Sequence, residues 1–158
     1  MKKIWLFIAT WGLVTTAVNL GNHASANGDD STSPHVDSKF EFPNTRWATV
    51  RQTIQVHVPP SSQALTLLWI DIPRNFELQT SKIEITDGNR LIPAPISRQG
   101  RWLLINFSQP ISPNTKLRID FNGVNRNMLL QSSVYSVYGK TIDGLTNFIG
   151  TAYFPQAD

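Results

Sequence analysis

Apolar and charged side chains alternate along residues 116–121, and this alternation constrains the fold more than any other feature of the chain. The apolar positions are Leu117, Ile119 and Phe121. The charged positions are Lys116, Arg118 and Asp120. Because successive side chains of a β-strand point to opposite faces, the pattern predicts a strand with an apolar face in the core and a charged face in water.

Similar patterns predict strands along most of the remaining chain. They cover residues 53–58, 64–72, 83–86, 91–92, 101–107, 133–139 and 147–154. The Asp87-Gly88 pair predicts a hairpin turn, and residues 140–144 predict a second turn. Residues 64–72 carry apolar side chains on both faces, which predicts a central and deeply buried strand.

The strand pattern favours an all-β fold, since no segment after Ala26 has an apolar stripe with helical spacing longer than two turns. Seven or eight short strands separated by prolines and glycines predict a single antiparallel β-sandwich of immunoglobulin-like type. A small β-barrel is the alternative. The chain has no cysteine, so burial rather than disulfide bonds must stabilise it.

The N-terminus has the layout of a secretory signal peptide. Lys2 and Lys3 precede a largely apolar run at residues 4–20, and Ala24-Ser25-Ala26 follows it. We expect cleavage after Ala26, no stable membrane insertion afterwards, and a periplasmic or extracellular location. An uncleaved anchor formed by residues 4–20 is the alternative.

Cleavage divides the chain into residues 1–26, a flexible leader at 27–39 and a β-sandwich domain at 40–158. The leader is rich in small polar and acidic residues. Without Lys2 and Lys3, 12 Lys and Arg remain against 11 Asp and Glu, so the net charge falls from +3 to +1. The basic residues are scattered among acidic ones, which argues against a nucleic-acid partner.

Metal-ligating residues are few after the expected cleavage point. His35 falls in the expected leader, and His57 alternates outward on a predicted strand, where we interpret it as a surface residue. Zinc sites usually draw three or four ligands from His and Cys, and these two histidines are poorly placed to supply them. The sequence therefore predicts no metal site and no cofactor.

Reactive motifs are also missing from the sequence. It contains no Gly-x-Ser-x-Gly nucleophile motif, no phosphate-binding glycine loop and no dinucleotide fingerprint. We therefore predict a non-enzymatic binding or accessory module, whose partner is an unidentified envelope protein or a glycan. The alternative is a carbohydrate-active or other hydrolase of unfamiliar type that uses a carboxylate such as Glu77 or Asp71.

Tryptophans are the first candidates for ligand contact, because aromatic faces hold sugar rings in many β-sandwiches. Trp69 and Trp102 lie inside apolar runs, so we assign them to the core. Trp47, with Arg46 and Arg51 on either side, is the candidate for a surface contact.

A second candidate contact follows the strand at residues 116–121. Asn122, Asn125, Arg126 and Asn127 are expected on a loop there. Loops on a rigid scaffold often carry function, although Asn and Gly also suit a purely structural turn.

Four segments, at residues 64–85, 100–127, 135–139 and 149–154, carry a family resemblance. In order they contain a tryptophan-bearing strand ending in Phe, a Pro-Ile-x-Pro turn, an amphipathic strand and a Val-x-Asn loop. Residues 40–154 resemble the small exported proteins, mainly cyanobacterial, that are grouped as domain of unknown function 2808. The resemblance implies a signal peptide and an all-β domain, and it implies no activity, catalytic residue or cofactor.

Overall fold

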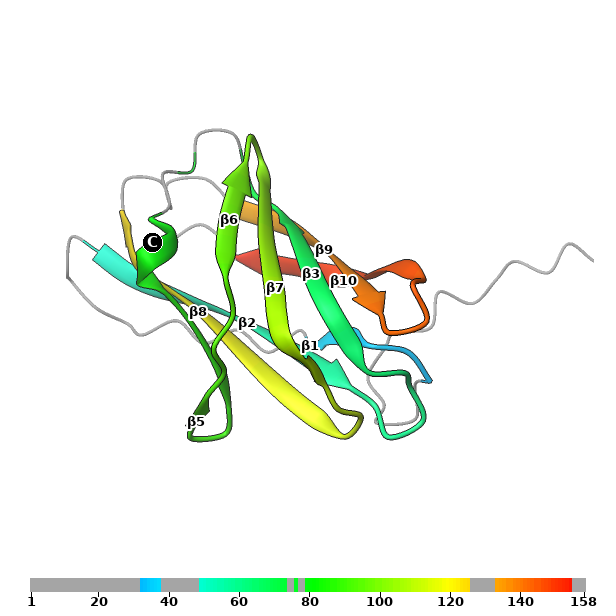
Figure 1. Ribbon diagram of the computed structural model, residues 1–158. Helices are drawn as coiled ribbons and strands as arrows, with labels where there is room; N and C mark the ends of the chain where they lie inside the picture. Colours follow the sequence, from blue (N-terminus) through cyan, green and yellow to red (C-terminus); the bar gives the residue numbers. More distant parts are fainter. Residues whose placement is uncertain (1–31, 38–48, 74–75, 77–78, 126–132, 155–158) are drawn as a thin grey trace, which may run out of the picture.

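The computed structural model describes residues 32–37, 49–73, 76, 79–125 and 133–154. They form two antiparallel five-stranded sheets that pack face to face (Figure 1). The prediction of an antiparallel, immunoglobulin-like β-sandwich is confirmed. The sheets stay open at their edges, so the barrel alternative is not formed.

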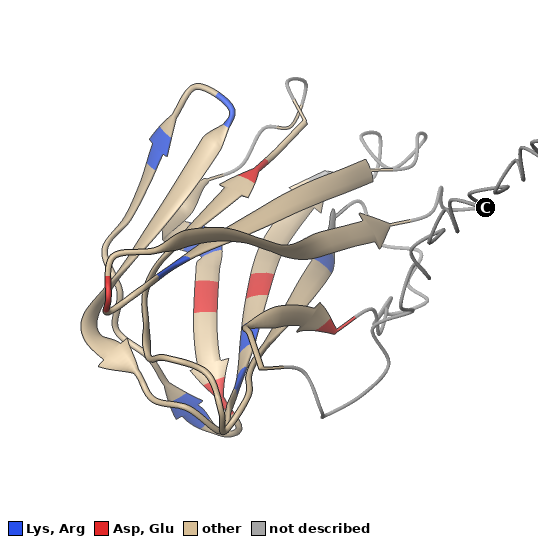
Figure 2. Cartoon of the chain, turned by 90° about the vertical axis from the view of Figure 1, so that its right-hand side faces the viewer, with Lys and Arg blue, Asp and Glu red and all other residues tan. Residues whose placement is uncertain are grey.

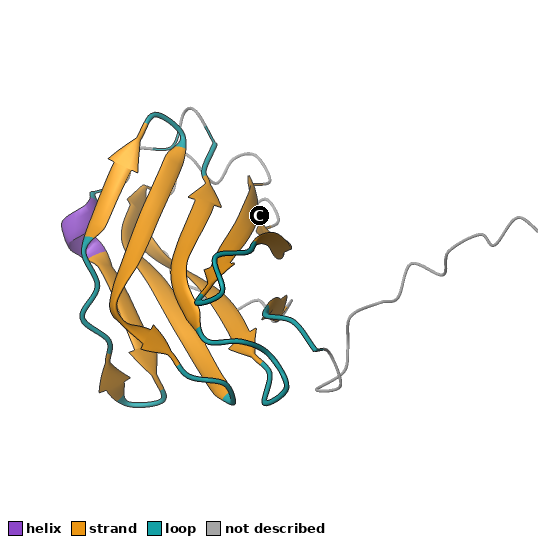
Figure 3. Ribbon diagram, turned by 45° about the vertical axis from the view of Figure 1, so that its right-hand side comes forward, coloured by secondary structure: helices purple, strands orange, loops and turns teal. Residues whose placement is uncertain are grey.

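The first sheet has the strand order β1-β2-β8-β4-β5, and the second has the order β10-β9-β3-β7-β6. The first contains β1 (His35–Asp37), β2 (Thr49–Val58), β8 (Thr115–Asn125), β4 (Ile83–Asp87) and β5 (Arg90–Leu91). The second contains β10 (Thr146–Phe154), β9 (Ser133–Thr141), β3 (Leu65–Asp71), β7 (Trp102–Ile111) and β6 (Ile96–Gln99). Within the described ranges the only helical element is the short 3-10 turn η1 (Thr80–Lys82), drawn in purple in Figure 3.

All eight predicted strands form, and β1 and β6 are added to them. These two strands are three and four residues long, too short for an alternating pattern to stand out. β4 and β5 form the expected hairpin, with Asp87 opposite Arg90. The expectation of a flexible leader is wrong for His35–Asp37, because these residues pair with β2.

An aromatic cluster occupies the core between the sheets. Tyr135 on β9 lies at its centre, with ring centroids 5.2 to 5.9 Å from those of Phe76, Phe121 and Phe154. The Tyr135 hydroxyl donates a hydrogen bond of 2.6 Å to Oε1 of Gln52 on β2, and both residues are fully buried. Burial raises the pKa of Tyr135 well above that of a free tyrosine, so the phenol stays neutral.

Charged residues are distributed over both sheets without a continuous block of either sign (Figure 2). Among the described residues, neither sheet carries the continuous row of Lys and Arg that is typical of a nucleic-acid-binding face. No helix in the described part of the chain has the length and apolar character needed to cross a bilayer.

We predict that Tyr135→Phe lowers the free energy of unfolding by about 1–3 kcal/mol, because it leaves the Gln52 carbonyl buried without its donor. Urea unfolding of the intact protein measures the change. Tyr138→Phe is the matched control, since Tyr138 lies on the outer face of β9 and is half-exposed. A Tyr135→Phe protein as stable as the parent would show that this hydrogen bond contributes nothing.

Candidate functional site

The outer face of the second sheet carries a row of large apolar side chains that crosses four strands. Leu104 on β7 lies opposite Trp69 on β3, Trp69 lies opposite Tyr138 on β9, and Tyr138 lies opposite Phe148 on β10. Trp102 packs edge-on against Tyr138 with ring centroids 5.7 Å apart. We call these five residues the aromatic face.

The aromatic face is open to solvent. Trp102 is 39% exposed and Phe148 is 57% exposed, while Trp69 and Tyr138 are half-buried. A shallow hollow of about 290 Å³ lies over it. The polar residues Gln99 and Thr146 complete the lining of the hollow. An apolar floor with polar groups at its rim is the usual composition of a small-ligand site.

The assignment of Trp69 and Trp102 to the core is wrong. Both side chains point away from the core, where the alternate residues Ile70 and Leu103 are fully buried. The predicted burial of residues 64–72 is therefore correct for one face of β3, while the other face is only half-buried.

A bidentate ion pair lies beside the aromatic face. Nε and Nη2 of Arg101 each donate to one oxygen of the Asp71 carboxylate at 2.6 Å. Asp71 is paired with Trp102 across the strands. The two arginine contacts hold the carboxylate in place and take up one position on each of its oxygens.

A second hollow, of about 380 Å³, lies between residues 90–93 and the β7–β8 turn. Its charged lining residue is Arg90, which is paired at 3.0 Å with Asp87. It has no aromatic side chain, so it offers less for recognition than the aromatic face does.

The outer face of the first sheet contains a polar network centred on Asp120. Thr53 donates to Asp120 at 2.5 Å, and Nε of Arg118 donates to both of its oxygens at 3.1 and 3.0 Å. Nε of Arg51 lies 3.9 Å from the same carboxylate. The expectation that Asp120 faces water is wrong, because these neighbours cover it.

The other candidate contacts fall on β8 or outside the described residues. Asn122 and Asn125 belong to β8 rather than to a loop, because the ladder with β2 continues to the pair of Thr49 and Asn125. The candidate Arg51, on β2, and the half-buried Asn122, on β8, both lie at the bulge of this ladder. The structure does not describe the four remaining candidates, which are Arg46, Trp47, Arg126 and Asn127.

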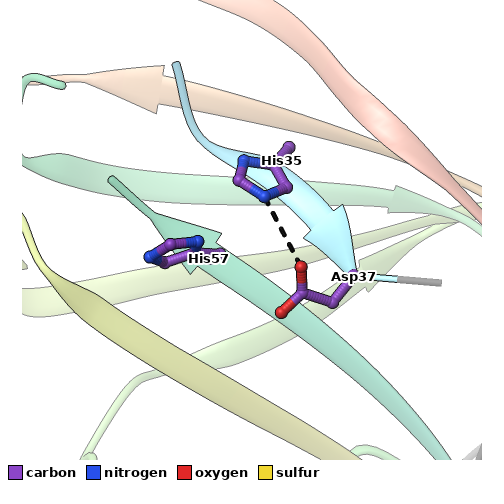
Figure 4. Close-up of side chains that lie close together, drawn as sticks. All are labelled: His35, Asp37 and His57. Atoms are coloured by element: carbon purple, nitrogen blue, oxygen red, sulfur yellow. Dashed lines mark ion pairs between the residues drawn. The ribbon is translucent and has the colours of Figure 1, made fainter. Parts of the chain in front are cut away.

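The histidines, expected to lie apart, are directly opposite each other on β1 and β2. The rings of His35 and His57 have centroids 5.0 Å apart, and Nε2 of His35 lies 3.5 Å from Oδ1 of Asp37 (Figure 4). His57 is only 3% exposed, so its interpretation as a surface residue is wrong. Among the described residues, these three form the group that could hold a metal ion.

A close contact with β10 positions β1. Gly150 has φ +147° and directly follows the register shift in the β9–β10 ladder, and a Cβ atom on it would lie 2.9 Å from Cβ of Val36. The buried Val36 side chain therefore uses the space that a larger residue at position 150 would occupy. This contact fixes His35 and Asp37, which flank Val36.

No protein-family model matches the chain, and no curated protein matches it. Solved structures do resemble it. BslA, a bacterial hydrophobin, shares 12% identity with a TM-score of 0.53 over 79% of this chain and 94% of its own. The collagen-binding subdomain ACE19 of an Enterococcus faecalis surface protein shares 9% identity with a TM-score of 0.43 over 73% of this chain and 92% of its own. The similarity to BslA agrees with the β-sandwich fold.

We predict that Gly150→Ala lowers the free energy of unfolding by about 1–3 kcal/mol and displaces β1, because the added methyl group meets Val36. Urea unfolding measures the stability, and NMR signals of the His35 and His57 rings report the position of β1. Gly144→Ala is the control, since Gly144 has φ +87° with no heavy atom within 4 Å of the added group. Equal effects of both substitutions on the histidine signals would contradict the proposed contact.

Proposed function

We propose that the protein is an exported, non-enzymatic binding module that holds a glycan chain of the cell envelope on its aromatic face. The observation that carries the proposal is the solvent-open row of aromatic side chains with a polar rim. The C–H groups of a sugar ring pack on the electron-rich face of an aromatic ring, and its hydroxyl groups bond to polar side chains at the edge.

The polar rim supplies the hydrogen-bonding groups that such a ligand needs. The Asp71 carboxylate can accept from sugar hydroxyls, since each oxygen has capacity left after its contact with Arg101. Gln99 offers both a donor and an acceptor. A strand-based floor holds these groups rigidly, which lowers the entropy lost on binding.

The N-terminal sequence supports export. The layout of residues 1–26 is that of a signal peptide, and the resemblance to domain of unknown function 2808 agrees with it.

N-terminal sequencing of the secreted protein tests this part of the proposal, with Asn27 as the expected first residue.

The hydrolase alternative receives less support than binding. Its candidate Asp71 is held in place by a bidentate pair with Arg101, and the residues that line the hollow include no second carboxylate of the kind a glycosidase needs. Its other candidate, Glu77, lies outside the described residues.

We predict that Trp102→Ala weakens glycan binding at least about tenfold, because central aromatic contacts dominate most interfaces. Sedimentation with insoluble cellulose, chitin and purified peptidoglycan measures the binding. Leu91→Ala is the matched control, since Leu91 is exposed on the edge strand β5 of the other sheet. Retention of the parent by none of the three polymers, or equal retention of the Trp102→Ala protein, would overturn the proposal.

A second candidate function is adsorption to an apolar surface or interface, which the turn between β9 and β10 favours. Ile142 and Leu145 are both exposed there, and the exposed Phe148 is three residues further along the chain. Exposed apolar groups concentrated in this way mark an interaction site.

We predict that the double variant Ile142→Ser/Leu145→Ser slows adsorption of the protein at an air–water interface, as followed by surface tension. Trp102→Ala leaves adsorption unchanged if the turn alone is responsible. The opposite ranking of the two variants would assign the surface activity to the aromatic face instead.

A further inference from the structure

We propose that His35, Asp37 and His57 bind a divalent transition-metal ion of the zinc type on the outer face of the first sheet. The site is separate from the aromatic face, which lies on the other sheet. A failure of glycan binding would therefore not contradict metal binding, and a failure of metal binding would not contradict glycan binding.

Strand geometry brings the three ligands together. His35 and His57 are directly opposite in the antiparallel ladder, and Asp37 follows His35 by two residues on the same face of β1. One ligand atom from each residue lies within 4.8 Å of the others. Ligand atoms around Zn²⁺ lie about 3.3–3.6 Å apart when each bond is about 2.0–2.2 Å long.

The pair of His35 and Asp37 already has this spacing, because Nε2 and Oδ1 are 3.5 Å apart. Figure 4 shows the His57 ring beside this pair. Small rotations of the side chains are therefore enough to close the three atoms around an ion.

A hydrogen bond orients the first histidine as a ligand. Nδ1 of His35 lies 3.3 Å from the carbonyl oxygen of Ser33. Since a carbonyl can only accept, this contact favours the tautomer with the hydrogen on Nδ1, in which Nε2, the ring atom nearer to Asp37, is the one that can bind an ion. Metal-binding histidines usually have their other nitrogen bonded in this way, to a backbone carbonyl or a carboxylate.

The surroundings combine a buried ligand with an accessible one. His57 is buried, whereas the Asp37 side chain is 28% exposed, so an ion can enter from the side of Asp37. Cations of the described residues on the same face include Lys116, opposite His57, and Arg118, opposite Gln55. Arg118 is neutralised by Asp120, and Lys116 is exposed to solvent.

The ligand set indicates which ions fit. Two imidazole nitrogens and one carboxylate oxygen suit Zn²⁺ and the neighbouring divalent ions Co²⁺, Ni²⁺ and Cu²⁺, whereas Ca²⁺ and Mg²⁺ prefer oxygen ligands alone. Three protein ligands leave a fourth tetrahedral position for water or for a group from another molecule. An ion bound here links β1 to β2 and so holds the short edge strand on the sheet.

The experiment is titration of the intact, tag-free protein with Zn²⁺ by calorimetry, and with Co²⁺ by visible absorption. We expect one equivalent of Zn²⁺ to bind and the Co²⁺ complex to show the intense visible bands of a tetrahedral site. A Zn²⁺ concentration of about 100 times the Kd raises the Tm by roughly 10 °C, because the ion binds the folded state.

Asp37→Asn and His35→Gln each weaken Zn²⁺ binding at least about tenfold. Both positions are partly exposed, so the variants are expected to fold. Asp87→Asn is the matched control, since the Asp87 side chain has a similar exposure of 32% and pairs with Arg90 at the far edge of the same sheet. Failure of the parent to bind Zn²⁺, or binding by Asp37→Asn and His35→Gln as tight as that of Asp87→Asn, would overturn the proposal.

Discussion

The hydrogen bond between Tyr135 and Gln52 joins the two sheets across a largely apolar interior. Apolar packing alone tolerates small shifts of one sheet against the other, because dispersion contacts have little directional preference. A buried donor and acceptor tolerate no such shift, since a misaligned pair leaves polar groups without partners. This contact therefore helps to fix the position of β9 against β2. The outer faces of the two strands are positioned with it.

The strand pattern was readable because most strands have one apolar and one polar face. It failed for Trp69 and Trp102, because a row of apolar side chains also crosses the outer face of the second sheet. The face that each tryptophan occupies could have been predicted from the residues two or four positions away on the same strand. Asp71 lies on the same face of β3 as Trp69, and Asn106 lies on the same face of β7 as Trp102. Each polar residue marks the solvent side of its strand, even inside an apolar run.

The histidine cluster could not be predicted from the sequence in the same way. His35 and His57 are separated by 22 positions, and only the pairing of β1 with β2 places them together. A three-residue strand has too few residues to show a period, and its polar neighbours in the sequence resemble a leader. Asn122 and Asn125 illustrate the reverse case, since composition pointed to a loop and the ladder of β2 and β8 keeps both in the sheet.

The irregularity at Gly150 has a consequence for self-association. β10 is an edge strand of nine residues with several apolar side chains, which is the kind of strand to which a second chain can add. The bulge interrupts its row of amide and carbonyl groups near the middle, and β1 lies against it there. Neither half of β10 then presents a long straight template, which disfavours pairing of a second copy with this edge.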